Sequence, residues 1–458
     1  MNMRYFARIA VPVALGLVAV SCGSEGPTGS PPDGSEPSTT PPATQPTTPP
    51  AETTVPSDAP GPARPIAMPA RLISTESPSI AGEAVTAFGY EVFAGSAALA
   101  DPSDNVVVSP LSIAIALAML EPGATGDAQT QLRTMLRIDD PVAWHASMNA
   151  LSQELEARVA ELPEPSDEQD PGEFVARIAN AAFVQPDYPF LPAYLDVVGT
   201  NYGAAIEELD FMADQAAAAD RINEFIATAT DDHITDLVNA SDIDPATKLA
   251  LVNALLLRAS WQSQFDAEAT VDDEFTLLDG SPVTVPFMHG FGDRSGSGDG
   301  WVAASKQLVG NVRLDVVLPD EGRFDEIADT LPSVLSEFDQ RATSGAELVV
   351  PRFETRVDVA LTDVLPGIGL TAPFTEGNLL DIADDPQLVL DKALHQTWLS
   401  VDETGIEAAA ATVLVMIATS APALEPVPVV LDRPFLFQIV DGMSGATLFT
   451  GRIMDPTS

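Results

Sequence analysis

The amino-acid sequence predicts one α+β domain that follows a low-complexity N-terminal region. Runs with helical periodicity gather in the first half of the chain, whereas short alternating or apolar runs bounded by turn residues gather in the second half. Helices first and strands later favour α+β over an alternating α/β fold. After about residue 75 no second low-complexity linker interrupts the chain, so we expect residues 76–458 to form a single domain.

The expected elements follow from these periodicities. Helical spacing of apolar residues predicts helices over 84–99, 109–136, 143–162 and 213–232, the second of them starting with a Ser-Pro pair that resembles a helix cap. Apolar or alternating runs predict strands over 312–322, 346–359, 427–441 and 446–456. The glycine-rich stretch 289–301, HGFGDRSGSGDGW, is expected to be a loop tip.

The charge balance excludes one class of function. The chain of 458 residues has 67 acidic and 21 basic residues, a formal net charge of -46. Such a surface repels nucleic acid and anionic lipid headgroups, so no nucleic-acid role is expected. We interpret the acidity mainly as a source of solubility.

The first 22 residues resemble the leader of a bacterial lipoprotein. Arg4 and Arg8 precede an apolar run, 9–20, that has the length of a signal peptide's hydrophobic region and is short for a membrane span. Residues 19–22, Ala-Val-Ser-Cys, are similar to the lipobox, in which the cysteine is lipidated. Cys22 is the only cysteine of the chain and cannot form an internal disulfide. We predict a signal peptide over 1–21, a lipid on Cys22 that anchors the exported protein to the membrane at the bacterial cell envelope or surface, or, as the alternative, a signal peptide with an incidental thiol.

Residues 22–75 are expected to form a tether. Most of this stretch is rich in Pro, Thr and Ser and almost free of large apolar residues. Such a composition cannot bury enough surface to offset chain entropy. We therefore predict a disordered, locally extended connection that holds the domain several nanometres from a membrane.

Motifs of common enzymes are missing from the sequence. No G-x-S-x-G or phosphate-binding glycine loop occurs, and the four histidines, His145, His233, His289 and His395, lack the spacing of zinc ligands. Nothing nominates a catalytic residue. We predict no enzyme activity, no metal and no cofactor.

The segment 403–416 carries conflicting local preferences. Four alanines, Ala408 to Ala411, favour a helix, and the next six residues, TVLVMI, favour a strand. As a strand, the segment would present one uncharged face that is small in its middle, and Gly405 would allow a backbone hinge. A core helix rich in small residues explains most of the same spacing. Local conflicts of this kind often mark functional or strained places.

At this segment the sequence resembles the serpins. Members of that family carry a hinge reading roughly E-x-G-[TS]-E-A-A-A-A-[TS], and residues 403–412, ETGIEAAAAT, match it. The resemblance extends over nearly the whole domain. Further matching motifs are NVVVSPLSIAIALAMLEPGATG at 105–126, IANAAFVQ at 178–185, LVNALLLRASWQSQF at 251–265, VPRF at 350–353, and LDRPFLFQI with LFTGRIMDP at 431–439 and 448–456.

The resemblance implies a serpin-like fold with three β-sheets, about nine helices and an exposed reactive-centre loop. It also implies a single-turnover inhibitor whose partner is a serine protease. The protease cuts the loop and forms an acyl-enzyme, and the cut loop inserts into the central sheet and traps the protease. We expect a monomer.

The resemblance assigns roles to individual residues. The hinge, residues 403–412, contains Glu403, Gly405, Ile406, Glu407, Ala408, Ala409, Ala410, Ala411 and Thr412. The polar cluster beneath the sliding strands contains Ser109, Pro110, Ser112, Asn223 and His395. Trp261, with a pair of opposite charges formed by Arg352 and Glu403, is expected where the loop enters the sheet.

The cut bond is placed by counting forward from the hinge as the family does. Sixteen residues beyond Glu403, this gives Thr419-Ser420, with Met416 or Ala418 as alternatives for the residue before the cut. Between Ile406 and Leu431 the sequence has no Lys, Arg, Phe, Tyr or Trp, which favours an elastase-like or subtilisin-like target. Ile406 stands where the family usually has Thr, Ser or Val, and its bulk is expected to slow insertion.

Two alternatives share much of this pattern. A non-inhibitory serpin would keep the fold, although the intact alanine run argues against it. A surface lipoprotein that binds a small solute would share the leader and the tether.

Overall fold

The computed structural model describes residues 13–22, 64–158, 172–407 and 427–458. Within these ranges the chain forms nine α-helices and two hydrogen-bonded β-sheets. Four parts of the chain lie outside the described residues: 1–12, 23–63, 159–171 and 408–426. The last of these contains Ala408 to Thr412 and the expected cut bond Thr419-Ser420.

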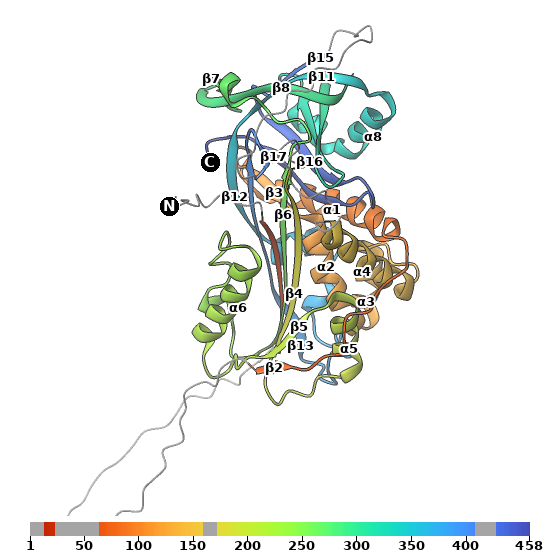
Figure 1. The fold of residues 1–458 in the computed structure, drawn as a ribbon. Coiled ribbons are helices and arrows are strands. Elements are labelled where there is room, and N and C mark those ends of the chain that lie inside the picture. The colour runs from red at the N-terminus through yellow and green to blue at the C-terminus, as the bar shows by residue number, and fades with distance from the viewer. Residues whose placement is uncertain (1–12, 23–63, 159–171, 408–426) are drawn as a thin grey trace, which may run out of the picture.

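The central sheet has eight strands and runs the length of the molecule (Figure 1). From one edge to the other the order is β12, β13, then β14 and β1 in the same lane, and then β6, β4, β5 and β2. Their bounds are β1 Val13–Cys22, β2 Arg64–Ile66, β4 Phe174–Val184, β5 Ala205–Glu208, β6 Thr247–Ser260, β12 Phe353–Ala360, β13 Leu388–Val401 and β14 Gly405–Ile406.

The second sheet has nine strands and divides into two parts that share strand β8. In one part β8 pairs with β7 and with β11, and β11 pairs with β15. In the other part the end of β8 pairs with β9, and the sheet continues through β10, β16, β17 and β3. The bounds are β3 Val106–Val108, β7 Val271–Thr276, β8 Pro282–Gly298, β9 Trp301–Leu308, β10 Val312–Pro319, β11 Thr343–Pro351, β15 Val427–Val430, β16 Phe435–Asp441 and β17 Thr447–Ile453. Counted with the central sheet, these two parts give the three sheets that the resemblance implied.

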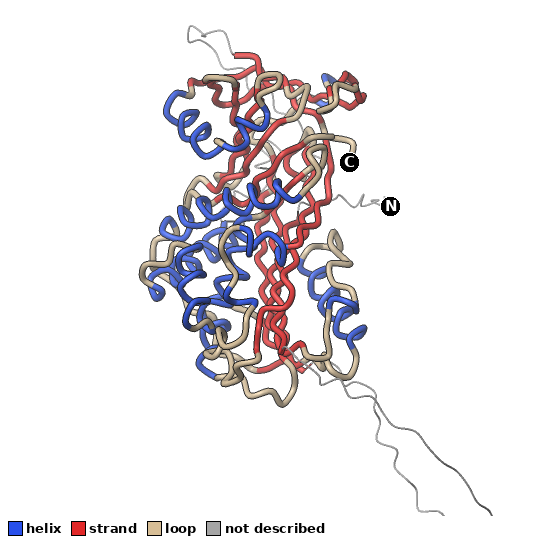
Figure 2. Tube along the Cα trace, turned by 180° about the vertical axis from the view of Figure 1, so that it is seen from behind, coloured by secondary structure: helices blue, strands red, loops and turns tan. Residues whose placement is uncertain are grey.

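Helices cover both faces of the central sheet (Figures 1 and 2). A cluster of helices lies on one face and α6 lies alone on the other, where it buries a separate core that includes Phe183, Ile222 and Trp398. The bounds are α1 Ser79–Leu99, α2 Pro110–Leu120, α3 Gly126–Met135, α4 Pro141–Ala157, α5 Pro192–Tyr202, α6 Gln215–Ala229, α7 Phe324–Asp329, α8 Leu331–Arg341 and α9 Leu361–Gly367.

The four predicted helices all form, one of them in two pieces. The expected helix 109–136 is interrupted by a 3-10 turn, Glu121–Gly123, and continues as α3. Pro122 has no backbone N–H and cannot continue the α-helical hydrogen-bond pattern, so α2 ends at Leu120. Helix α2 starts as expected, since the Ser109 hydroxyl accepts a hydrogen bond from the Ser112 N–H at 3.3 Å.

The prediction of a loop over 289–301 is wrong. Residues up to Gly298 belong to β8, which pairs with β11 and β9, so only the turn 299–300 is a loop. Glycines in this strand make room for bulky side chains. A Cβ atom at Gly290 would lie 2.6 Å from the Phe265 ring, and one at Gly298 would lie 2.5 Å from the Trp301 ring. Here glycine marks close packing rather than a turn.

The last part of the predicted tether is structured, so its boundary at residue 75 is wrong. Strand β2, which starts at Arg64, pairs with β5. Further on, the Arg71 side chain donates to Asn149 Oδ1 at 2.9 Å and forms an ion pair with Glu156 at 3.1 Å. The backbone N–H of Leu72 donates to the Thr200 carbonyl at 2.8 Å. A charged anchor and backbone pairing order a segment that has few apolar residues.

Residues 13–22 of the predicted leader form strand β1 inside the central sheet (Figure 1). The described ranges contain no helix with the length and apolar character of a membrane span. Removal of the leader, the lipid on Cys22 and export stay predictions.

Candidate functional site

The candidate site is the lane of the central sheet between β13 and β6, which we call the strand slot. Both strands pair antiparallel with β14 and with β1, so they run parallel to each other with one strand between them. Residues of β14 fill only the first positions of the slot. Ile406 lies opposite Val401 on one side and Ala259 on the other. The start of the expected reactive loop is therefore already a strand of this sheet.

At the end of the slot where β14 lies, Trp261 binds the backbone of the hinge. Its indole N–H donates to the carbonyl of Asp402 at 2.8 Å, and its backbone N–H donates to the carbonyl of Thr404 at 2.9 Å. The Asp402 carboxylate accepts in turn from the N–H groups of Thr404 and Gly405 at 2.8 and 3.1 Å. These contacts fix the turn from which β14 starts.

The expected pair of opposite charges is also at this end. Arg352 Nη1 lies 3.5 Å from Glu403 Oε2, and Thr270 Oγ1 donates to Glu403 Oε1 at 2.8 Å. The Arg352 side chain is half exposed, so the ion pair alone contributes only about 0–1 kcal/mol. Its effect is to orient Glu403 rather than to stabilise the domain strongly.

Ile406 is fully buried, and Glu407 marks the point where β14 stops. Glu407 has a backbone φ of 44°, in the left-handed region that costs a non-glycine residue energy. Among the described residues its buried carboxylate has no hydrogen-bond partner, and its nearest opposite charge is Arg258 Nε at 3.7 Å. Burial, reinforced by nearby carboxylates and opposed by Arg258, raises the pKa of Glu407 to about 8.

Lys306 belongs to this end of the slot, although sequence reasoning did not single it out. Its Nζ lies 4.4 Å from the centroid of the Phe265 ring and 5.6 Å from that of Trp261, and it donates to the Phe291 carbonyl at 2.8 Å. Burial lowers the pKa of Lys306 to about 8. The only hint in the sequence is the rarity of lysine in this chain.

A buried polar cluster lies beneath the middle of the slot. The Ser109 N–H donates to His395 Nε2 at 3.0 Å, and the Ser109 hydroxyl donates to the Leu448 carbonyl at 2.7 Å. Ser112 Oγ donates to Asn253 Oδ1 at 2.5 Å, and Asn253 Nδ2 donates to Asn180 Oδ1 at 2.8 Å. With Pro110 as the first residue of α2, the structure brings Ser109, Pro110, Ser112 and His395 together as expected.

The assignment of Asn223 to this cluster is wrong. Asn223 lies in α6, where its amide donates to the Val238 carbonyl at 2.7 Å and accepts from the Val238 N–H at 3.0 Å. The asparagine of the cluster is Asn253, in β6. It lies within the segment 251–265 that was already matched to the family, and that match could have identified it.

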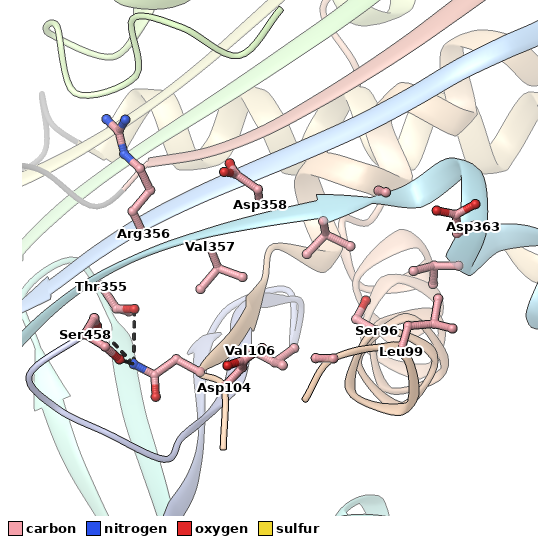
Figure 3. A pocket seen from close by; sticks show the side chains of 15 residues that line it. Ser96, Leu99, Asp104, Val106, Thr355, Arg356, Val357, Asp358, Asp363 and Ser458 are labelled. Atoms are coloured by element: carbon pink, nitrogen blue, oxygen red, sulfur yellow. Dashed lines mark hydrogen bonds between the residues drawn. The ribbon is translucent and has the colours of Figure 1, made fainter. Parts of the chain in front are cut away.

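A separate pocket of about 500 Å³ lies beside β12 (Figure 3). Val357 points into it, whereas Arg356 and Asp358 point to the other face of the strand. Asn105 Nδ2 donates to Thr355 Oγ1 at 3.3 Å at its rim. None of the residues that line this pocket belongs to β6, β13 or β14, so it is distinct from the strand slot.

Comparison with known proteins gives one family. The model of the family described as "Serpin (serine protease inhibitor)" matches residues 83–456. An uncharacterized serpin-like protein of Thermococcus kodakarensis is 31% identical over 381 residues, which are 81% of this chain and 85% of the relative. Neuroserpin of Homo sapiens is 32% identical over 372 residues, which are 77% of this chain and 86% of that protein.

Solved structures agree with the fold. The thermophilic serpin tengpin in its native state superimposes with a TM-score of 0.69 at 22% identity, covering 85% of this chain and 96% of tengpin. Human thyroxine-binding globulin in complex with thyroxine gives a TM-score of 0.70 at 23% identity, covering 83% of this chain and 100% of that structure. At these identities the structures establish the shared fold alone.

Proposed function

Because this chain belongs to the serpin family, we propose that it is a single-use inhibitor of serine proteases, spent in trapping one protease molecule. The matching family model is described as that of a serine protease inhibitor. The observation that carries the proposal is strand β14. Its two residues pair with β13 on one side and β6 on the other, so the hinge already starts the strand that insertion would complete.

In the proposed reaction the protease supplies the nucleophile. Its serine Oγ attacks the carbonyl carbon of Thr419, the peptide bond to Ser420 breaks, and the new amine of Ser420 leaves with a proton. Thr419 is then held to the protease as an ester. The freed segment extends β14 into the strand slot and carries the protease along before water can hydrolyse that ester.

The slot offers a defined path for this movement. A strand that continued β14 in register would pass between His395 and Asn253 at its seventh residue, counted from Ile406 as the first. Both of these residues belong to the polar cluster beneath the slot. Each new ladder hydrogen bond contributes about 0.5–1.5 kcal/mol, and buried apolar area adds to that.

The composition of the loop supports a target that accepts small or aliphatic residues. Between Ile406 and Leu431 there is no basic or aromatic anchor, so the charged pocket of a trypsin-like protease would find no partner. We infer an elastase-like or subtilisin-like protease, with Met416 and Ala418 as the other positions for the cut.

We further propose that the mature protein is exported, monomeric and held to the cell envelope by a lipid on Cys22. The support is the leader-like sequence and the long segment 23–63 between Cys22 and the domain. Labelling of intact cells with an antibody against the domain tests surface display, and mass spectrometry of the N-terminal peptide tests the lipid. An unmodified Cys22 in the native host would contradict the anchor.

The decisive experiment mixes the chain that lacks residues 1–22 with an elastase-like and a subtilisin-like serine protease. We expect an adduct that survives denaturing electrophoresis, with a cut at Thr419-Ser420 found by intact mass. A protease whose serine is replaced by alanine is the control and forms no adduct. Loop cleavage without an adduct for every protease tried would instead support a non-inhibitory serpin.

A further inference from the structure

Strand β1, Val13–Cys22, fills the strand slot beyond β14. It pairs with β13 from Val13 opposite Trp398 to Cys22 opposite Leu388, and with β6 along its other edge. Ten residues from the far N-terminus thus lie in the centre of the sheet (Figure 1). They have a strand partner on both sides.

The register of β1 coincides with the path proposed for the reactive loop. Ile406 lies opposite Val401 and Ala259. An antiparallel strand that continued from there would place its third further residue opposite Trp398 and Leu256. Those two residues are the ones that border the first residue of β1. Both edges of the slot give this same register, so β1 continues the lane of β14 without an offset.

The two segments are also similar in chemistry and direction. Residues 13–19, VALGLVA, and residues 409–415 of the expected reactive loop, AAATVLV, are uncharged and mostly apolar. Strand β1 is antiparallel to both border strands, as β14 is. One lane cannot hold two strands, so the segments exclude each other.

At the middle of the slot β1 passes over the polar cluster. Gly16 lies opposite His395 on one side and Asn253 on the other. These are the residues that Ser109 and Ser112 bind from α2. Strand β1 therefore lies between the same two residues, His395 and Asn253, that an inserting loop would have to pass.

We propose that residues 13–22 are an intramolecular plug of the strand slot, which keeps the unprocessed chain unable to insert its reactive loop. While the plug is attached, a protease that cuts the loop finds no open lane to pull it in, and the ester is hydrolysed. Removal of the leader before Cys22 would open the slot. The effect on loop insertion and protease trapping rests on the proposed inhibitory function, whereas the occupancy of the slot by residues 13–22 does not.

The single cysteine of the chain gives a direct test of occupancy. Because Cys22 lies opposite Leu388, the variant Leu388→Cys should form a disulfide within the full-length chain under mild oxidation. The control Ala393→Cys should form none, since Ala393 lies opposite Val18. Peptide mapping of the full-length chain, produced without export, reads out both.

A second engineered cysteine pair covers the case in which the Leu388→Cys variant fails to fold. Ala19 lies opposite Lys392, so Ala19→Cys with Lys392→Cys, in a Cys22→Ser background, should also crosslink. Absence of a disulfide in every folded variant with a cysteine pair would overturn the proposal that residues 13–22 occupy the strand slot. This result does not depend on whether the chain inhibits any protease.

The functional arm compares the full-length chain with its Leu17→Pro variant, in which proline removes a ladder donor from the middle of β1. We expect adduct formation to rise by on the order of tenfold or more, the ratio that 1.4 kcal/mol of plug binding produces. Ala43→Pro, outside the plug, is the control and should change nothing. A locked disulfide variant that forms adduct as fast as its reduced form would overturn the proposal.

A melting experiment separates failure of the plug from failure of the proposed function. If no form of the chain traps a protease, the proposed inhibitory function is wrong. The plug is then tested by the thermal stability of chains whose loop has been cut. Cleaved Leu17→Pro chain should then gain thermal stability while cleaved wild-type full-length chain should not. Equal gains for the two would reject the plug.

Discussion

Ser112 Oγ lies 2.5 Å from Asn253 Oδ1 and ties helix α2 to strand β6, one border of the strand slot. The link continues through Asn253 Nδ2 to Asn180 Oδ1 in β4 at 2.8 Å. Ser109, three residues before Ser112, reaches His395 in the opposite border strand β13. One helix start therefore contacts both borders of the slot, and any widening of the slot must break one of these bonds.

Replacing Asn253 by alanine removes two of these hydrogen bonds and leaves the Ser112 hydroxyl and the Asn180 carbonyl buried without them. We expect a loss of about 2–4 kcal/mol in the free energy of unfolding and faster spontaneous loop insertion. Denaturant melts and the decay of inhibitory activity on incubation measure the two effects. Asn223→Ala in α6 is the matched control. If it accelerates insertion as much as Asn253→Ala, the polar cluster does not control the slot.

Replacing Glu407 by glutamine should change how stability depends on pH. The pKa of Glu407 is raised by burial to about 8 from its ordinary value of 4.5, so the folded state binds this proton more tightly than the unfolded state. The stability that the proton confers is complete below pH 4.5 and is lost as pH rises to about 8. Glu407→Gln should thus be more stable than wild type at pH 9, by about 2–5 kcal/mol, and equal to it near pH 4.5.

Thermal melts of wild type and Glu407→Gln at pH 4.5, 7 and 9 check this dependence. Glu347→Gln, at an exposed position, removes the same charge and should shift the melting temperature equally little at each pH. A difference between Glu407→Gln and wild type that does not grow with pH would contradict the buried carboxylate.

Replacing Asp441 by asparagine should unfold the domain more readily. Asp441 is fully buried and accepts from Arg158 Nη1 at 2.5 Å and from the Ser444 N–H at 2.9 Å. Burial alone would raise the pKa of Asp441, but the bonds from Arg158 and Ser444 hold it below its usual range. Its contribution to stability is present above pH 3.8 and is lost as pH falls through the lowered pKa.

The expected cost of Asp441→Asn at pH 7 is about 3–5 kcal/mol, because Arg158 is left buried with Glu154, at 3.8 Å, as its remaining opposite charge. Urea unfolding of the chain from residue 23 onward measures it. Asp299→Asn, which removes the charge of an exposed pair with Arg323, should cost far less, because solvent screens that pair. Equal costs for the two would show that burial does not set the strength of the Arg158 contact.

Replacing Trp261 by phenylalanine keeps an aromatic ring but removes the hydrogen bond to the Asp402 carbonyl. We expect a loss of about 1–2 kcal/mol and faster backbone amide exchange at Thr404 and Gly405. Hydrogen exchange with mass analysis of the peptide 398–407 measures it. Trp301→Phe, in β9, should leave that peptide unchanged, and protection lost equally in both variants would contradict a local role for Trp261.

An arginine scan of the expected cut site tests the reactive bond. Thr419→Arg should convert the chain into an inhibitor of trypsin-like proteases, since the residue before the cut fills the charged pocket of such a protease. Met416→Arg and Ala418→Arg are the matched controls. Adduct with trypsin for only one of the three identifies the residue before the cut, and adduct with Met416→Arg or Ala418→Arg alone would move the bond away from Thr419.

Much of the fold could be predicted from the sequence because local preference and tertiary structure agree there. Amphipathic helices such as α1 and α6, and short apolar strands bounded by turn residues such as β10 and β17, appear where the sequence predicts them. Strands β4 and β6 were not predicted as strands. Both are largely buried and, at 11 and 14 residues, longer than a typical strand, and a long apolar run without a clear period does not separate strand from helix.

The site was predictable where a motif fixed the residue, and not where burial alone did. Trp261, Arg352 and Glu403 were placed by matching segments and do lie together. Asn223 was assigned to the polar cluster in place of Asn253. The residue type is the same, and the sequence alone does not show that Asn223 lies in a helix and Asn253 in a strand that borders the slot. The left-handed backbone of Glu407 and the buried position of Lys306 depend on contacts between distant elements, which no local pattern encodes.

The two ends of the expected reactive segment are attached to different sheets, β14 to the central sheet and β15 to the second. A cut at Thr419-Ser420 would release residues 420–458 as a separate polypeptide that contains β15, β16 and β17. Since every residue of β16 and β17 is buried, this fragment would stay bound as an interior component of the cleaved molecule. Size-exclusion chromatography without denaturant would therefore show no change on cleavage, and only a denaturing gel would separate the small C-terminal chain.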